Sequence, residues 1–325
     1  MMNIKEIICS IKEQVPGKTI DTVYFVACGG SYGGFYPAFY LLEHESTTLR
    51  TAMFTSNEFV HALPKNCGHN TIVICCSMRG TPETIEAARI AREAGAVTIA
   101  LYVLDSKLTE NSDYRYKYQS IAEEASRQEE VNSSVALRIA FEILEQFEGY
   151  EHYEDAMKAF NILDDIYKDA VKFCKPRAKA FSEAFKNEEC IYVLGAGPSM
   201  GAAYIFSICN LMEMQWIHSP TVNHGELLHG PFEAIDKNTP LFILMSEGRT
   251  RAVDVRALKF LQAYGEKLVV LDAKDLGINR ISDSVSEYFN HLIFAPVLNN
   301  VFLRELAKVK KHPYTNRRYM WKVKY

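Results

Sequence analysis

Short apolar runs rich in β-branched and aromatic residues alternate with longer amphipathic runs along nearly the whole chain. Apolar runs of about four to eight residues are typical of buried strands, and amphipathic runs of about ten or more are typical of helices. The pattern predicts strands at 22–28, 49–54, 71–76, 97–102 and 114–119, and again at 190–195, 216–222, 240–245, 267–272 and 291–295. This alternation predicts an α/β fold, with a doubly wound, five-stranded parallel sheet in each half and helices on both faces.

The two halves are similar to each other at a constant offset of 168 residues. The offset matches Tyr24 with Tyr192, Gly29 with Gly197, Ser31 with Ser199, Gly33 with Gly201 and Tyr36 with Tyr204. A fixed internal offset is the mark of a repeated structural unit. We therefore expect one domain at 1–160, a second at 161–310 and a C-terminal tail at 311–325, with a helical connector at roughly 132–186.

Composition and charge exclude several classes of protein. The 325 residues are 48% hydrophobic and 23% charged, with 36 Lys and Arg against 40 Asp and Glu, which excludes a disordered chain. A net charge of −4 argues against a nucleic-acid partner. No apolar run approaches the ~20 residues that cross a bilayer, and the N-terminus lacks a signal-peptide pattern.

The eight cysteines also indicate a compartment. None forms a Cys-x-x-Cys pair, and most stand in apolar runs, where a free thiol behaves as a small hydrophobic group. A disulfide framework is not expected in such a chain, so the sequence predicts a protein of the reducing cytoplasm.

A glycine-rich turn follows the first predicted strand. Cys28, Gly29, Gly30 and Ser31 would stand at the start of a helix, whose free N–H groups suit a phosphate. Gly29, Gly30, Gly33 and Gly34 do not fit Gly-x-Gly-x-x-Gly, so no nicotinamide cofactor is expected. A tight turn without a ligand is the alternative interpretation.

A second turn of the same kind follows the third predicted strand. Its candidate phosphate-binding residues are Ser77, Met78, Gly80, Thr81 and Thr84. Two such turns on neighbouring strands can share one phosphate. Alternatively, Ser77 or Thr81 serves only as a helix N-cap, a role that uses the same N–H groups.

Candidate acid and base residues stand in the second half. Glu213 lies in an apolar helical run, and desolvation there would raise its proton affinity and suit a general base. His229, in a glycine-flanked loop, could act as an acid near neutral pH. The alternatives are a solvated glutamate and a histidine satisfied elsewhere. His218, His224, Glu226 and His229 are close in sequence, but their spacing is not His-Glu-x-x-His, and no metal is expected.

The C-terminal segment is basic and aromatic. Residues 304–324 hold eight Lys and Arg and one Glu, together with Tyr314, Tyr319, Met320 and Trp321. A nucleic-acid arm is conceivable. The aromatic side chains favour an ordered, packed tail that delivers a lysine to an anionic ligand.

The paired units resemble SIS (sugar isomerase) domains, a flavodoxin-like fold, in tandem across nearly the whole chain. The turn 28–31 resembles the first phosphate turn of that family, and 77–84 resembles the second, usually Ser-x-Ser-Gly-x-Thr. Arg79 stands where the second Ser is expected, and the loop is one residue short.

A narrower resemblance assigns roles to individual residues. Glu213, the segment 225–231 and Arg318-x-x-x-Lys322 resemble the isomerase half of glucosamine-6-phosphate synthase. The resemblance implies that Glu213 moves a proton between C1 and C2 and that Lys322 helps close the site. It also implies that His229 opens the sugar ring from a partner subunit, and hence a homodimer or higher oligomer with shared sites. Glu226, Arg318 and His218 are expected to support these groups.

The segments 212–219 and 312–325 are most similar to fructoselysine-6-phosphate deglycases, so a complete glutamine-dependent synthase with a glutaminase domain is not expected. The similarity implies cleavage of fructoselysine 6-phosphate, or a related fructosamine 6-phosphate, to glucose 6-phosphate and a free amine, without a cofactor. Arg79 and Arg249 are candidates for contacting the amine. A glucosamine-6-phosphate deaminase and a sugar-phosphate sensor without turnover are the alternatives.

Overall fold

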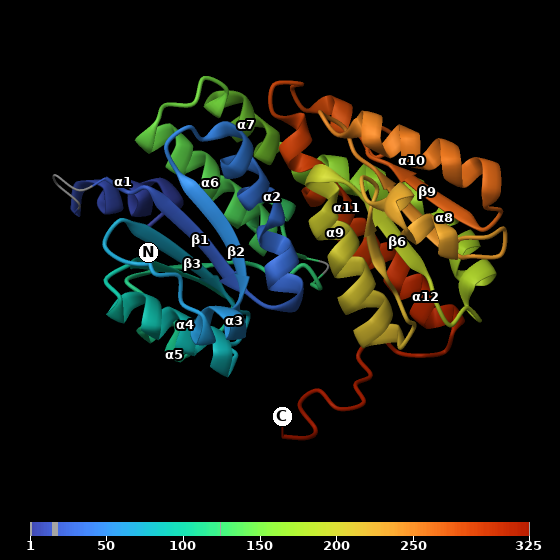
Figure 1. Cartoon of the computed structure of the whole chain (residues 1–325), viewed down its shortest axis with the longest axis horizontal. Helices are drawn as coiled ribbons and strands as arrows, with labels where there is room; N and C mark the ends of the chain where they lie inside the picture. The colour runs from blue at the N-terminus through green and yellow to red at the C-terminus, as the bar shows by residue number, and fades with distance from the viewer. Residues whose placement is uncertain (1, 15–18, 124, 325) are drawn as a thin grey trace. The chain divides into compact units, whose positions relative to one another are not determined.

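The computed structural model describes residues 2–14, 19–123 and 125–324, and the chain divides into two compact units, Met1–Asn161 and Ile162–Tyr325 (Figure 1). Each unit is an α/β layer structure, as the alternating pattern predicts. Tyr325, at the end of the predicted tail, lies outside the described residues. No helix in the described part of the chain is long and apolar enough to cross a membrane.

The first unit is built on a parallel sheet of five strands in the order β2-β1-β3-β4-β5. The strands are β1 (Thr22–Ala27), β2 (Arg50–Thr55), β3 (Thr71–Cys76), β4 (Val97–Tyr102) and β5 (Tyr114–Lys117). The helices are α1 (Ile4–Gln14), α2 (Gly29–Glu45), α3 (Ser56–His61), α4 (Pro82–Glu93), α5 (Lys107–Glu110), α6 (Asn132–Phe147) and α7 (Tyr153–Asn161). All five predicted strands are confirmed to within two residues at either end.

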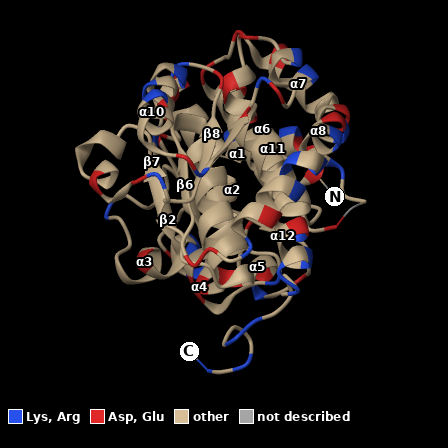
Figure 2. Ribbon diagram, turned by 90° about the vertical axis from the view of Figure 1, so that its right-hand side faces the viewer, with Lys and Arg blue, Asp and Glu red and all other residues tan. Residues whose placement is uncertain are grey.

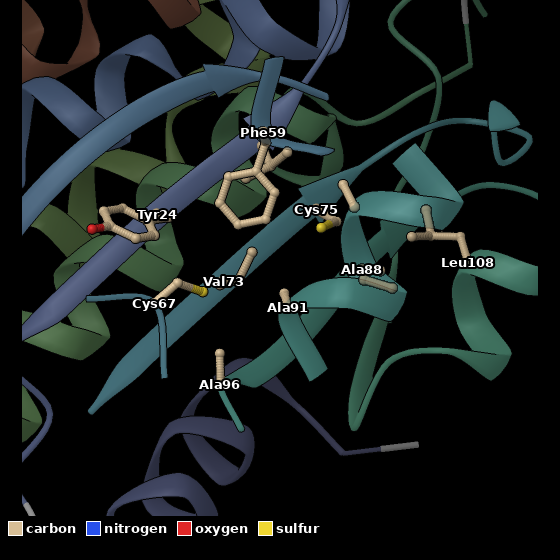
Figure 3. Packing of buried hydrophobic residues seen from close by; sticks show 12 residues of the cluster. Tyr24, Phe59, Cys67, Val73, Cys75, Ala88, Ala91, Ala96 and Leu108 are labelled. Atoms are coloured by element: carbon tan, nitrogen blue, oxygen red, sulfur yellow. The ribbon is translucent and has the colours of Figure 1, made fainter. Parts of the chain in front are cut away.

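Alternate residues of the first sheet face opposite helical layers. Tyr24, Val73 and Cys75 point toward α3 and α4, where Phe59 and the small side chains of α4 cover them (Figure 3). The helices α1, α2 and α6 lie on the other face (Figure 1). Both faces of the central strands are therefore buried, which explains their continuous apolar sequences.

The second unit repeats the first four strands of this arrangement, in the order β7-β6-β8-β9. The strands are β6 (Tyr192–Gly195), β7 (Thr221–Asn223), β8 (Leu241–Met245) and β9 (Leu268–Asp272). The helical elements are α8 (Leu163–Phe185), α9 (Met200–Tyr204), the π-helix η3 (Ile205–Glu213), the 3₁₀ turn η4 (Leu227–His229), α10 (Arg251–Tyr264), α11 (Asn290–Val297), the π-helix η8 (Leu298–Phe302) and α12 (Leu303–Val309). Phe242 of β8 packs at the centre of a ring cluster with Phe181, Phe206 and Phe302, at centroid distances of 5.3, 4.8 and 5.2 Å.

Two strand predictions in the second half are corrected. The run predicted as a strand at 291–295 lies inside α11, so the second sheet has four strands and not five. All eight residues of α11 are buried. Because a fully buried helix lacks a polar face, its sequence cannot be distinguished from that of a buried strand by periodicity. The strand predicted at 216–222 is confined to Thr221–Asn223.

The C-terminal segment is only partly packed. Trp321 and Tyr319 expose 72% and 63% of their surface, so the expectation that the aromatic tail is buried is wrong for these side chains. Figure 2 shows that Lys and Arg recur along this segment up to the C-terminus.

Candidate functional site

The first predicted phosphate turn begins the helix α2. Cys28 is its N-cap residue, with extended backbone, and Gly29 follows with φ +55°. That left-handed value favours glycine over any residue with a side chain. The amides of Gly30 and Ser31 stand in the first helical turn, where N–H groups lack intrahelical partners and attract an anion.

The side chain of Ser31 is tied to the sheet beneath the turn. Its hydroxyl is hydrogen-bonded to the thiol of Cys76 and the hydroxyl of Tyr118, and Asn132 also bonds Cys76. Burial raises the pKa of Cys76 to about 11, and it raises that of Tyr118 as well, so both groups stay protonated. These contacts tie the Ser31 side chain to the end of β3.

The second predicted phosphate turn begins α4 at the same edge of the sheet. The registered pair Ala27 and Cys76 ends β1 and β3, so the two turns follow adjacent strands at the same level. Ser77 Oγ accepts a hydrogen bond from Thr81 N at 3.0 Å, which closes the turn over Gly80. Two helix N-termini therefore converge on one edge of the first unit, an arrangement that suits a phosphate.

Thr84 supports the second turn from inside the unit. It is fully buried, and its hydroxyl lies 2.9 Å from Thr81 Oγ1 and 2.8 Å from Ser56 Oγ. Met78, in contrast, is 36% exposed. Gly80 has φ +72°, and a Cβ atom there would lie 2.3 Å from Ser106 Oγ, so only glycine fits. Of the candidate residues in this turn, Ser77 and Thr81 lie at the helix start. Thr84 lies in the interior and contacts Thr81 through its hydroxyl.

Side chains of the second unit pack closely against the glycines of its equivalent turns, as Ser106 does against Gly80 in the first. A Cβ atom at Gly197 would lie 2.4 Å from Thr250 Oγ1, and one at Gly248 would lie 2.3 Å from Glu287 Cβ. The carboxylate of Glu287 accepts the backbone N–H of Arg249 at 2.9 Å. Glu287 therefore supplies an acceptor to this loop from within the unit. Arg249 also bonds Glu287 and Tyr288 through its guanidinium.

Glu213 ends the π-helix η3 and lines a pocket of about 560 Å³. The pocket is lined by Met212, Glu213, Trp216, Ile217, His218, Arg317, Arg318, Tyr319 and Met320. The Glu213 side chain is 24% exposed, and its Oε1 lies 2.7 Å from Arg317 Nη2. Desolvation raises the pKa of Glu213, and the Arg317 guanidinium opposes part of that rise.

The C-terminal segment supplies the other wall of this pocket. Trp216, at φ +57°, is contacted by the ring of His312 at 4.4 Å and by the guanidinium of Arg318 at 4.4 Å. Lys322 Nζ donates to the backbone carbonyl of Arg317. The structure thus groups Glu213, His218 and Arg318 around one pocket and links Lys322 to Glu213 through Arg317.

His229 and Glu226 stand elsewhere in the second unit. Both are exposed and belong to the loop around η4, and neither is among the described residues that line the Glu213 pocket. Within the described part of the chain, no three His, Cys, Asp or Glu side chains are grouped as metal ligands.

A buried, hydrogen-bonded pair of His224 and Asp254 precedes the His229 loop, and the pairing was not predicted from the sequence. His224 Nδ1 lies 2.7 Å from Asp254 Oδ1, and neither side chain has any exposed surface. Asp254 Oδ2 accepts the backbone N–H of Ser246 at 2.7 Å, and burial raises the pKa of Asp254 against the opposing effect of His224. The available signal was an aspartate on the buried stripe of α10, three residues before Ala257.

Arg317 was missed for a different reason. The motif that resembles the synthase isomerase half draws attention to Arg318 and Lys322, whereas the structure pairs the preceding arginine with Glu213. No pattern in the sequence distinguishes two adjacent arginines in a segment without regular structure.

Comparisons with known proteins bear on the whole chain. No protein-family model matches it. The chain is 41% identical over 315 residues to the fructosamine deglycase FrlB of Bacillus subtilis, covering 96% of this chain and 95% of that protein. It is 25% identical over 269 residues to a fructoselysine 6-phosphate deglycase of Escherichia coli K12, covering 82% and 77%. A crystal structure from Salmonella typhimurium LT2, provisionally described as a phosphosugar isomerase, superposes with a TM-score of 0.96 at 44% identity and covers 99% and 96% of the two chains.

We expect the substitution His224→Ala to lower the free energy of unfolding of the second unit by about 3 kcal/mol, because it removes the hydrogen-bond partner of the buried Asp254 Oδ1. Urea unfolding followed by tryptophan fluorescence measures this, since both tryptophans, Trp216 and Trp321, belong to the second unit. The control is His229→Ala, which removes an exposed histidine of the adjacent turn η4, and a change within about 0.5 kcal/mol is expected. Equal effects of the two substitutions would contradict the importance of the buried pair.

Proposed function

The chain belongs to the fructosamine deglycase family of SIS-domain proteins, and from this we propose that it hydrolyses fructosamine 6-phosphates, among them fructoselysine 6-phosphate, in the cytoplasm. The products are glucose 6-phosphate and the free amine, which is lysine for fructoselysine 6-phosphate. The observation that carries the proposal is the carboxylate of Glu213, three-quarters buried on the wall of a pocket of about 560 Å³.

In the proposed reaction, Glu213 is the base. It takes a proton from C1 of the open-chain ketone, the C1–H electrons form a C1–C2 double bond, and the C2 oxygen gains a proton, which gives a 1,2-enaminol. Return of the proton to C2 draws the nitrogen lone pair into a double bond with C1 and leaves a protonated imine. Water then adds to C1, and the carbon–nitrogen bond breaks to release the amine and the aldehyde of glucose 6-phosphate. The raised pKa of Glu213 supports this role, since it moves the carboxyl toward the pH at which a base is efficient.

The two turns at the edge of the first sheet are the proposed phosphate site. The residues from Cys28 to Ser31 lie at the N-terminus of α2, and Ser77, Gly80 and Thr81 lie at that of α4. The two helix starts are neighbours because β1 and β3 are adjacent strands. Binding the non-reacting phosphate supplies energy for orienting C1 and C2. This assignment is supported by the second unit, where the carboxylate of Glu287 accepts a backbone N–H of the corresponding loop.

His229 is proposed to assist ring opening from a partner subunit. Its exposure on a loop away from the Glu213 pocket supports a role across an interface, and the active enzyme would then be a homo-oligomer. Lys322 is proposed to act with the tail in closing the site, which its bond to the Arg317 carbonyl supports.

A product assay tests the proposal. The purified protein is incubated with fructoselysine 6-phosphate, and glucose 6-phosphate is followed through its dehydrogenase while lysine is quantified separately. Equimolar glucose 6-phosphate and lysine are expected. Turnover of glucosamine 6-phosphate in its place would establish a deaminase, and binding of both compounds by folded protein without turnover would establish a sensor.

Glu213→Gln should lower kcat by about 10³-fold, within the range that general bases contribute, while glucose 6-phosphate binds nearly as well as to the wild type. Single-turnover kinetics and calorimetry measure the two quantities. Glu183, an exposed residue of α8 that pairs with Lys186, provides the control. Glu183→Gln should leave both kcat and the affinity for glucose 6-phosphate unchanged. Parallel loss of turnover and binding would argue against a base.

Ser77→Ala should weaken binding of glucose 6-phosphate by about tenfold or more, because a hydrogen bond to a charged group and the bond that closes the turn are both lost. Titration calorimetry measures the affinity. Ser246→Ala is the matched control, since Ser246 directly follows β8 in the second unit as Ser77 directly follows β3 in the first. If both substitutions have the same effect, the phosphate does not bind at the first unit's turns.

A further inference from the structure

Arg317 is held in a fixed orientation by its own tail. Its Nη1 donates to the carbonyls of Tyr314 and Asn316, at 2.8 Å each, and its Nη2 faces Glu213 Oε1. The side chain is only 10% exposed. A guanidinium placed this way is prepared to receive an anion along its remaining edge.

That remaining edge is only half occupied. Glu213 contacts Nη2 with one oxygen, and Arg317 Nε is buried without a hydrogen-bond partner among the described residues. The Nε–Nη2 edge of an arginine matches the two oxygens of a carboxylate, and a pair bonded through both nitrogens is stronger than one bonded through a single nitrogen. A buried N–H without a partner costs free energy that a better-fitting carboxylate would recover.

The pocket also carries more positive than negative charge, which favours binding of a second anion. Its walls carry two guanidinium groups, of Arg317 and Arg318, against the single carboxylate of Glu213. The phosphate of the proposed substrate is assigned to the turns of the first unit. The guanidinium groups of Arg317 and Arg318 are therefore not needed for the phosphate, and they can bind an anionic group on another part of the substrate.

The proposed reaction indicates which part of the substrate lies near these cations. Glu213 must touch the hydrogen on C1, and the amine nitrogen is bonded to C1. The substituent of the amine therefore begins beside Glu213, within reach of the arginine that lies 2.7 Å from it.

We propose that Arg317 is a specificity-determining residue that binds the free carboxylate of an amino-acid amine, and that this carboxylate displaces Glu213 from Arg317. The inference rests on the proposed deglycase function. Before binding, the guanidinium stabilises the ionised form of Glu213 and so weakens it as a base. After the exchange, Arg317 pairs with the substrate, and Glu213 is released to take the C1 proton. Recognition of the amine and activation of the base are then one event.

The probes are the 6-phosphorylated Amadori products of glycine and of lysine, each compared with its carboxamide counterpart. The carboxamide has nearly the same shape without the charge. For the wild type we expect kcat/KM to be at least about tenfold higher with the carboxylate of a pair, as the loss of a charged hydrogen bond implies. Equal values in both pairs would overturn the proposal even though deglycase activity is present. Absence of turnover with all four probes would instead reject the proposed function itself.

Variants assign the preference to Arg317. In Arg317→Met, kcat/KM for the carboxylate should fall at least about tenfold, while that for the carboxamide stays or rises because Glu213 is no longer paired. A merely structural role would lower both. Arg317→Lys, which keeps the charge without the two-nitrogen edge, should lie between, and it serves if the methionine variant fails to fold. Loss of the preference in Arg318→Met but not in Arg317→Met would overturn the assignment.

The pH profile gives an independent measure. Activity is lost as pH falls through the pKa of the base, and removing a cation that lowers this pKa must move the acidic limb of kcat/KM to higher pH. Arg317→Met should show this displacement, and Lys308→Met, which removes an exposed charge on α12, should not. An unmoved limb in Arg317→Met would contradict the pairing in solution.

Discussion

Parallel pairing of β1 with β3 is the constraint on which the proposed phosphate site depends. Parallel strands need crossover helices, so each helix must start at the edge where the strand before it ends. The register that pairs Ala27 with Cys76 then brings the starts of α2 and α4 to the same level. Hydrogen bonds within the sheet thus determine where partial positive charge gathers, before any side chain contributes.

The second unit has the same parallel strand order, but its loops have different contacts. Its four strands follow the order of the first four strands of unit one, and its corresponding loops also contain glycines with positive φ. There, however, Glu287 and Thr250 pack against those glycines, and a carboxylate accepts the loop amide of Arg249. The two copies have therefore diverged, since in the second copy a carboxylate accepts a loop amide and another, partly buried carboxylate ends a π-helix.

The properties of Glu213 come from two opposing effects. Burial against apolar side chains raises its pKa, and the guanidinium of Arg317 lowers it. The guanidinium belongs to the C-terminal segment and the carboxylate to η3. The pKa of Glu213 therefore depends on the position of that segment. Trp216, contacted by both His312 and Arg318, holds the segment in place and so takes part in setting the balance.

The sequence by itself determined the α/β class, eight of the ten predicted strands in position, the internal repeat and both glycine turns, because these depend on short-range periodicity and on the backbone freedom of glycine. It also singled out Glu213, whose apolar neighbours are adjacent in the chain. Only the tertiary structure decided that residues 291–295 are helical, that Arg317 and not Arg318 faces Glu213, and that His224 pairs with Asp254. These outcomes depend on groups 30 to 104 residues apart or on burial from all sides, and local pattern carries no information about such distant partners.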